Sequence, residues 1–126
     1  MKKEIYSKKA PKPIGPYSQA IKINNLIFIS GQIGIDSKKG ILIAKNIKEE
    51  TTIIMENIKH ILQASNSNFE NVVKSSIFLS KMNLFDDVNE IYKGYFSKPY
   101  PARETIEVSY LPKNVNIEIS VIAMTK

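Results

Sequence analysis

The 126-residue sequence contains no cysteine, one histidine and one arginine. Without thiols, and with a single imidazole, the chain cannot build a tetrahedral zinc site, an iron–sulfur cluster, a thiolate nucleophile or a disulfide framework from its own side chains. The absence of cysteine is typical of an intracellular protein. These classes of function are therefore excluded at the outset.

The sequence also lacks long hydrophobic runs. No aliphatic or aromatic run exceeds the four residues of Leu26–Ile29, whereas a membrane span needs about 20 residues and a signal-peptide core about 7–15. The hydrophobic fraction of 43% is that of a folded protein. We expect one cytoplasmic domain over residues 1–126, without a membrane partner, because one core is normal for about 100–150 residues.

Basic residues outnumber acidic residues by 18 to 12, and all but Arg103 are lysines. The lysines are scattered along the whole chain, and no aromatic-rich strand of the kind that binds RNA accompanies them. This distribution favours a solvated lysine surface, and nucleic acid remains a less favoured partner.

The hydrophobic pattern predicts an α+β fold, because alternating β-branched segments indicate strands and apolar residues at 3.6-residue spacing indicate helices. The predicted strands are residues 18–23, 26–30, 72–79, 105–110 and 115–124, with a short additional strand at 4–7. One predicted helix runs over 46–64, where Asn46 and Glu49 have the side chains of a capping box. Asn83 begins the second predicted helix in the same way, and Pro99 prevents that helix from continuing.

Two helices can cover only one face of such a sheet. The last predicted strand carries Ile122 and Met124 on its polar side, which gives the uncovered face an apolar part. We therefore expect this face to pack on other copies of the chain and predict a homo-oligomer. The alternative is a monomer with a few exposed apolar residues.

Two charged residues are candidates for chemistry. Arg103 lies in a proline-restricted segment just before a predicted strand, where its guanidinium would bind a carboxylate or phosphate through two parallel hydrogen bonds. Glu118 lies in mid-strand, where burial would raise its pKa towards the range useful for proton exchange. The alternatives are a surface ion pair of Arg103 with Glu104 or Glu107, and a solvated Glu118 opposite a lysine.

Polar residues near element ends are weaker candidates for ligand binding. Tyr17 follows Gly15 and Pro16, Ser30 ends the strand formed by the apolar run, and Asn89 lies beside the apolar stripe of the second helix. Taken singly, each is explained as well by an ordinary structural role: a packed tyrosine, a turn serine and a helix-edge asparagine.

Several short segments become specific when they are taken together and in order. They are Ile14–Ala20, Ser30–Ile33, Asp87–Tyr92, Pro101–Arg103, Glu107-Val108, Leu111–Lys113 and Ile117–Ile119. In a chain of this length, they resemble the signature segments of the RidA/YjgF family, and the resemblance covers essentially the entire chain.

The resemblance implies a chorismate-mutase-like α+β fold with two helices on one face of a mixed sheet. It also implies a homotrimer with a central barrel and with ligand sites between subunits. The implied activity is hydrolysis of reactive 2-imino acids and their enamine tautomers, such as 2-iminobutanoate and 2-iminopropanoate, to 2-oxo acids and ammonia. It requires neither a cofactor nor a metal.

Carried onto this sequence, the resemblance implies that Arg103 binds the substrate carboxylate and that Glu118 positions or activates the attacking water. Tyr17, Ser30, Gly31 and Asn89 would shape and polarise the substrate-binding cleft. Orientation and one proton relay are enough for this reaction, because an iminium carbon is already electrophilic.

One departure from the family pattern lies beside the candidate arginine. Glu104 occupies a position where many members have a small hydroxyl residue, and it is expected to compete for the guanidinium or to repel an anionic substrate. Two other functions stay open: an endoribonuclease or translation inhibitor, and a non-catalytic protein that binds 2-oxo acids.

Overall fold

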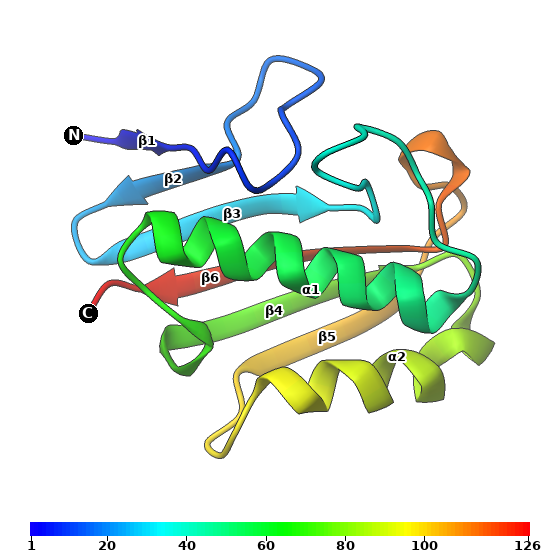
Figure 1. Ribbon diagram of the computed structural model, residues 1–126. Helices are drawn as coiled ribbons and strands as arrows, with labels where there is room; N and C mark the ends of the chain where they lie inside the picture. The colour runs from blue at the N-terminus through cyan, green and yellow to red at the C-terminus, as the bar shows by residue number, and fades with distance from the viewer.

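Six strands form one mixed sheet in the computed structural model, which describes residues 1–126 (Figure 1). The strands are β1 (Lys3–Ile5), β2 (Ala20–Ile23), β3 (Leu26–Gln32), β4 (Val72–Leu79), β5 (Ala102–Glu107) and β6 (Ile117–Met124). Their order across the sheet is β1-β2-β3-β6-β4-β5, and only the edge pair β4 and β5 is parallel. The predicted α+β class and the predicted order of elements are confirmed.

The long helix α1 (Ile47–Ala64) begins as its sequence predicts. The Oδ1 atom of Asn46 accepts a hydrogen bond from the Glu49 N–H at 2.9 Å. The Glu49 carboxylate reaches one residue further back than in a standard capping box and accepts from the Lys45 N–H at 2.8 Å. Neither α1 nor any other helix combines the length and apolar character required to cross a membrane.

The start of the second helix differs from the prediction. Helix α2 covers Phe85–Tyr92, and Asn83 lies before it inside a 3-10 turn, where its side chain caps nothing. The turn is held from outside, because the Met82 N–H donates to the Glu107 carboxylate at 2.7 Å. This contact joins residues distant in sequence, so a local capping pattern cannot reveal it.

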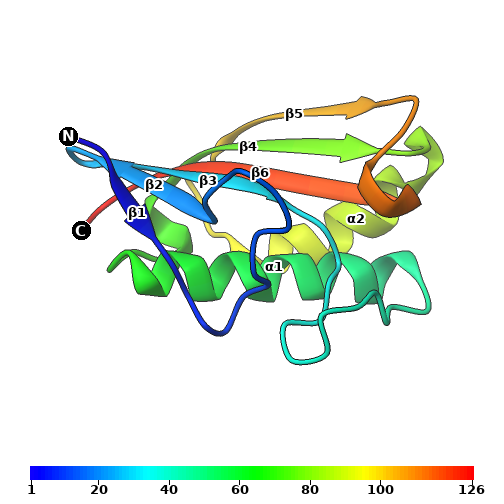
Figure 2. The same ribbon diagram turned by 90° about the horizontal axis from the view of Figure 1, so that it is seen from above.

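Both helices lie on the same face of the sheet, as Figure 2 shows. On the predicted apolar face of α1, Ile54, Ile58 and Ile61 are fully buried in one core with strand residues such as Ile77 and Ile119. Burying each such side chain contributes roughly 1.5–3 kcal/mol, so this layer is the main source of stability.

The opposite face of the sheet remains uncovered and partly apolar. Leu26, Phe28 and Met124 are 39%, 41% and 44% exposed on it, and Ile122 is half-buried beside them. The predicted apolar side of the last strand is therefore confirmed. The homo-oligomer itself remains a prediction.

The last part of the sheet corrects the predicted strand boundaries. β5 begins at Ala102, three residues earlier than predicted, and ends at Glu107. Its bounds follow from parallel pairing with β4, in which Ala102 lies opposite Lys74 and Glu107 opposite Leu79. Arg103 is consequently a strand residue and does not lie in the loop before a strand, so the sheet fixes the direction of its side chain.

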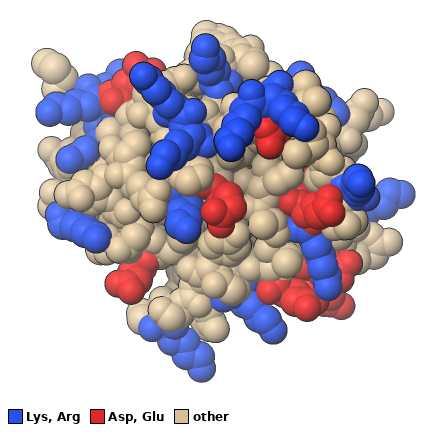
Figure 3. All heavy atoms as spheres, in the orientation of Figure 1, with Lys and Arg blue, Asp and Glu red and all other residues tan.

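Lysines are spread over the helix-bearing face of the molecule, with acidic side chains between them (Figure 3). The visible surface has no continuous basic stripe of the kind that follows a nucleic-acid backbone. This distribution agrees with the solvated lysine surface predicted from the sequence.

Candidate functional site

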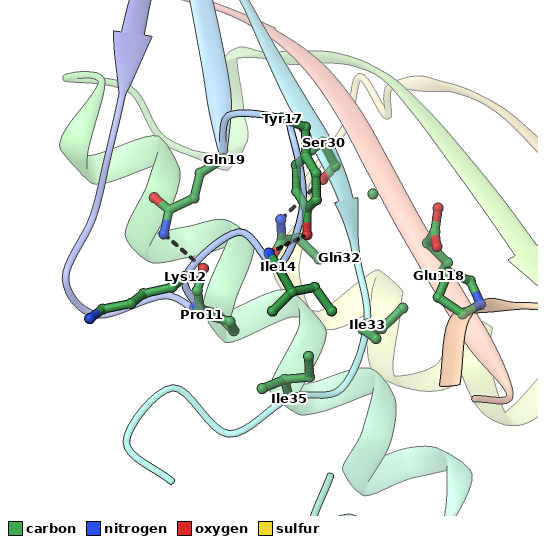
Figure 4. Close-up of a pocket in the computed structure, with 12 residues that line it drawn as sticks. Pro11, Lys12, Ile14, Tyr17, Gln19, Ser30, Gln32, Ile33, Ile35 and Glu118 are labelled. Atoms are coloured by element: carbon green, nitrogen blue, oxygen red, sulfur yellow. Dashed lines mark hydrogen bonds between the residues drawn. The ribbon is translucent and has the colours of Figure 1, made fainter. Parts of the chain in front are cut away.

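A cleft of about 370 Å³ opens beside the end of β3 (Figure 4), and we call it the β3 cleft. The segment before β2, the end of β3 and the start of β6 all contribute to its walls. Its lining residues are Pro11, Lys12, Ile14, Tyr17, Gln19, Ser30, Gly31, Gln32, Ile33, Ile35, Pro112 and Glu118. Four of the six predicted site residues are therefore brought together here.

A β-bulge places Gly31 against Glu118. The pairing of β3 with β6 shifts between Ile29 and Gln32, so that one extra residue is accommodated on β3. A Cβ atom on Gly31 would overlap the Glu118 carboxylate, so only glycine leaves room for it. The bulge thus lets the carboxylate lie directly against the backbone of β3.

The Glu118 carboxylate is half-buried and forms no hydrogen bond or ion pair within the chain. Burial raises its pKa, because the charged form loses part of its hydration. A carboxylate with a raised pKa and unused lone pairs is suited to accept a proton from a water molecule.

The hydroxyl residues of the β3 cleft are fixed from different sides. The Ser30 hydroxyl donates to the backbone carbonyl of Ser18 at 2.6 Å, which joins the end of β3 to the segment before β2. Tyr17 is 49% exposed above the cleft, and its hydroxyl accepts a long hydrogen bond of 3.5 Å from the Ile14 N–H. Both oxygens therefore keep capacity for a ligand.

Arg103 lies in a different pocket, which we call the Arg103 pocket. Its guanidinium donates to the Asn89 side-chain oxygen at 2.8 Å. The guanidinium carbon lies 5.5 Å from the centre of the Phe85 ring and 5.0 Å from that of Tyr92. Two aromatic rings and one amide from α2 therefore orient the group, while Arg103 itself remains exposed to a ligand.

Tyr92 is itself held in place under the guanidinium. Its hydroxyl donates to the Ser75 hydroxyl at 2.8 Å, and both residues are buried. Burial raises the pKa of Tyr92, which keeps the phenol neutral and able to donate. Ser75 lies opposite Arg103 in the parallel pair of β4 and β5, so the whole arrangement follows from strand register.

The expected competition of Glu104 for Arg103 is wrong. Neighbouring residues in a strand point to opposite faces, and Glu104 accepts hydrogen bonds from Ser76 and from Lys74, the latter at 3.1 Å. These contacts, that of Ser76 first, lower the pKa of Glu104. The predicted alternative of a surface ion pair is also wrong, because Arg103 pairs with neither Glu104 nor Glu107.

The predicted site residues therefore form two groups within one chain. Tyr17, Ser30, Gly31 and Glu118 line the β3 cleft, whereas Asn89 and Arg103 line the other pocket. The β4 strand separates β5 from β6. Arg103 points to the helix side of the sheet, and Glu118 lies on the open side.

The sequence alone does not single out the aromatic pair under Arg103, Phe85 and Tyr92. In the sequence, Phe85 and Tyr92 belong to the apolar stripe of the second predicted helix. Their spacing with Asn89, at i, i+4 and i+7, would place all three on one face of a helix. That this helix face contacts Arg103 is known only from the register of β5.

No three Asp, Glu or His side chains lie close enough together to hold a metal ion. The arrangement offers instead a guanidinium that can bind a carboxylate in two places and a half-buried carboxylate that can accept a proton.

Comparison with known proteins supplies a family context. A family model described as Endoribonuclease L-PSP matches residues 7–125. A RutC family protein of Pyrococcus horikoshii is 50% identical over 123 residues, which is 98% of each chain. The 2-iminobutanoate/2-iminopropanoate deaminase of Homo sapiens is 44% identical over 124 residues, covering 98% of this chain and 90% of that one.

Solved structures agree with the fold. The crystal structure of E. coli TdcF with bound serine matches with a TM-score of 0.93 and 33% sequence identity, covering 98% of this chain and 99% of that one. The similarity thus extends over all the elements that carry the two pockets.

Proposed function

The chain belongs to the RidA/YjgF/L-PSP family, and from that membership we propose that it hydrolyses 2-imino acids to 2-oxo acids and ammonia. The human relative is named for deamination of 2-iminobutanoate and 2-iminopropanoate, and these are the proposed substrates. The single observation that supports the proposal most strongly is that the chain has both an oriented, ligand-accessible guanidinium in the Arg103 pocket and a half-buried carboxylate, that of Glu118, in the β3 cleft.

In this proposal Arg103 binds the substrate carboxylate. A guanidinium accommodates both oxygens of a carboxylate in one plane, and the stacking on Phe85 and Tyr92 reduces the entropy lost on binding. Asn89 accepts from one side of the guanidinium and so leaves its other N–H groups for the ligand.

Glu118 then orients and deprotonates the attacking water. The water oxygen bonds to the imine carbon, the water proton passes to Glu118, and the C=N π electrons move to nitrogen. Glu118 returns this proton to the nitrogen of the tetrahedral adduct, and the hydroxyl proton of the adduct then also passes to nitrogen through Glu118. The C–N bond breaks, the C=O bond forms and ammonia leaves. Water is the only co-reactant, and no cofactor is required.

A homotrimer would bring the two pockets together. The substrate carboxylate is bonded directly to the carbon that is attacked, so the groups that serve them must lie close together. Within one chain, Arg103 and Glu118 are on opposite sides of the sheet. We therefore assign Arg103 and Asn89 to one subunit, and Tyr17, Ser30, Gly31 and Glu118 to its neighbour, with the apolar open face forming the contact.

The test is a coupled assay in which threonine dehydratase and Thr generate 2-iminobutanoate. Purified protein is expected to accelerate release of 2-oxobutanoate. Arg103→Lys is expected to lose at least about 100-fold in kcat/KM, because an ammonium cannot replace the two-point contact. Lys93→Arg, at the rim of the same pocket, is the matched control. Equal rates for wild type and Arg103→Lys, with the oligomer intact, would contradict the role of Arg103.

The description of the family model keeps a ribonuclease function as the second candidate. In that function Arg103 would bind a phosphate in place of a carboxylate. Cleavage of RNA that disappears with Arg103→Ala and persists through stringent repurification would support it. Cleavage that survives Arg103→Ala would not come from this site.

A further inference from the structure

We propose that Gln19 is a positioning residue: its side-chain amide fixes the segment that carries Tyr17 above the β3 cleft and thereby sets substrate affinity. This inference rests on the proposed function for its kinetic consequence but not for its structural one. It starts from a buried polar side chain that the proposed chemistry does not use.

The Gln19 side chain is 1% exposed and fully engaged in hydrogen bonds. Its oxygen accepts from the Ser7 N–H at 2.6 Å. Its nitrogen lies 3.1 Å from the carbonyl oxygen of Ser7, 3.4 Å from that of Ala10 and 2.9 Å from that of Pro11. One amide thus holds the segment 7–11 against the start of β2, and both its donors and its acceptor are used.

The next segment, Lys12–Tyr17, depends on this attachment, and we call it the arch. Its hydrogen bonds are all internal: the Tyr17 N–H donates to the Gly15 carbonyl at 2.8 Å, and the Ile14 N–H to the Tyr17 hydroxyl at 3.5 Å. No hydrogen bond joins the arch to the rest of the molecule. The position of the arch is therefore set by its two ends.

Gln19 controls one end directly and contributes to the other. At the first end, its amide holds Pro11. At the second end, the Ser30 N–H donates to the Gln19 carbonyl at 2.9 Å, while the Ser30 hydroxyl holds Ser18. The same residue thus ties the arch to Ser30, and Figure 4 shows Gln19, Tyr17 and Ser30 beside one another, with Glu118 across the cleft.

The surroundings of Gln19 select an amide over a carboxylate. A glutamate at this position would keep the acceptor for Ser7 but direct a second oxygen at three carbonyl groups, where burial leaves no water to separate them. Protonation of that glutamate would restore one donor. A Gln19→Glu variant should therefore release the arch at high pH and recover it in part at low pH.

The kinetic test compares Gln19→Glu with Gln63→Glu, which makes the same change at an exposed position of α1. At pH 8 we expect KM for the imine to rise about tenfold in Gln19→Glu with kcat within about twofold, because the amide N–H contacts to the buried carbonyl groups are lost while Glu118 is untouched. The KM ratio to wild type should shrink as the pH is lowered to about 5.5. Gln63→Glu should match wild type throughout.

Trypsin supplies a readout that requires no activity. Lys8 and Lys9 lie in the segment that Gln19 holds, and we expect Gln19→Glu to be cleaved there faster than wild type or Gln63→Glu. If the wild type shows no imine hydrolysis but cleavage follows this pattern, the proposed function fails and the attachment stands.

Gln19→Met, which is uncharged and of similar size, covers the case in which Gln19→Glu does not fold. It should show the raised KM and faster cleavage at every pH. A folded variant with unchanged KM and unchanged cleavage would overturn the proposal. A smaller fraction of active protein with an unchanged KM would also overturn the proposal, because a residue that only stabilises the fold behaves in this way.

Discussion

Mixing two inactive variants should restore activity, because Arg103 and Glu118 cannot serve one small substrate from the same chain. β4 lies between their strands, so about 10 Å separates the strands in the sheet plane, and the side chains point to opposite faces. We expect Arg103→Ala and Glu118→Gln each to be inactive alone. Unfolded together in equal amounts and refolded, they should form mixed trimers that hydrolyse the imine.

The expected magnitude follows from counting sites. A working site needs an intact Arg103 from one subunit and an intact Glu118 from its neighbour. With random assortment each condition is met half the time, so about one quarter of the wild-type activity should return. Wild type mixed with the double variant is the matched control: about one quarter remains if sites lie between subunits, whereas about one half remains if each site lies within a chain.

The assay is 2-oxobutanoate release in the coupled reaction, with distinguishable tags on the two chains to establish that mixed oligomers form. Activity that stays at the level of the single variants, although mixed oligomers are present, would refute the assignment of the two pockets to different subunits.

Three further predictions concern Glu118 and the open sheet face. Because burial raises the pKa of Glu118 and only its carboxylate accepts a proton, kcat should fall as the pH is lowered through a midpoint above the ordinary glutamate value of 4.5. The folded state binds this proton more tightly than the unfolded state, because burial raises the pKa of Glu118 only in the folded state. The Tm of wild type minus that of Glu118→Gln should therefore rise as the pH falls through the same range. A Tm difference that does not change with pH would contradict the burial of Glu118. Phe28→Asp places a charge on the apolar open face and should convert a trimer of the 14.3 kDa chain to monomers, as measured by sedimentation. Ile41→Asp, on an exposed loop, should leave the trimer intact. A Phe28→Asp variant that still sediments as a trimer would show that the open face does not form the subunit contact.

Local patterns in the sequence predicted the elements that are stabilised locally. The spacing of Ile54, Ile58 and Ile61 indicates α1, and the chemistry of Asn46 places its start, because a helix and its cap involve residues near one another in sequence. The predicted start of α2 at Asn83 was wrong, since the turn before this helix is held by the bond from Met82 to the distant Glu107. The bounds of β5 were shifted for the same reason: they depend on parallel pairing with β4.

The candidate site likewise has a part that local sequence patterns predict and a part that depends on contacts between distant residues. Motifs predicted the six candidate residues, but their partition between two pockets depends on which face of the sheet each side chain occupies. The direction of Arg103 follows from its register with Ser75, and the proximity of Gly31 to Glu118 follows from a β-bulge. Gln19 carried no signal of its role, because its four partners are backbone groups, which have the same chemistry in almost every residue.

Hydrolysis of the imine itself by this chain is tested most directly with a source of imine other than a dehydratase. An amino-acid oxidase acting on 2-aminobutanoate generates 2-iminobutanoate, and semicarbazide traps whatever has not been hydrolysed. With the wild-type protein present, the trapped imine should decrease and ammonia should appear faster than in buffer, in proportion to protein concentration. Trapping and ammonia release that are the same with and without the protein would contradict the proposed function.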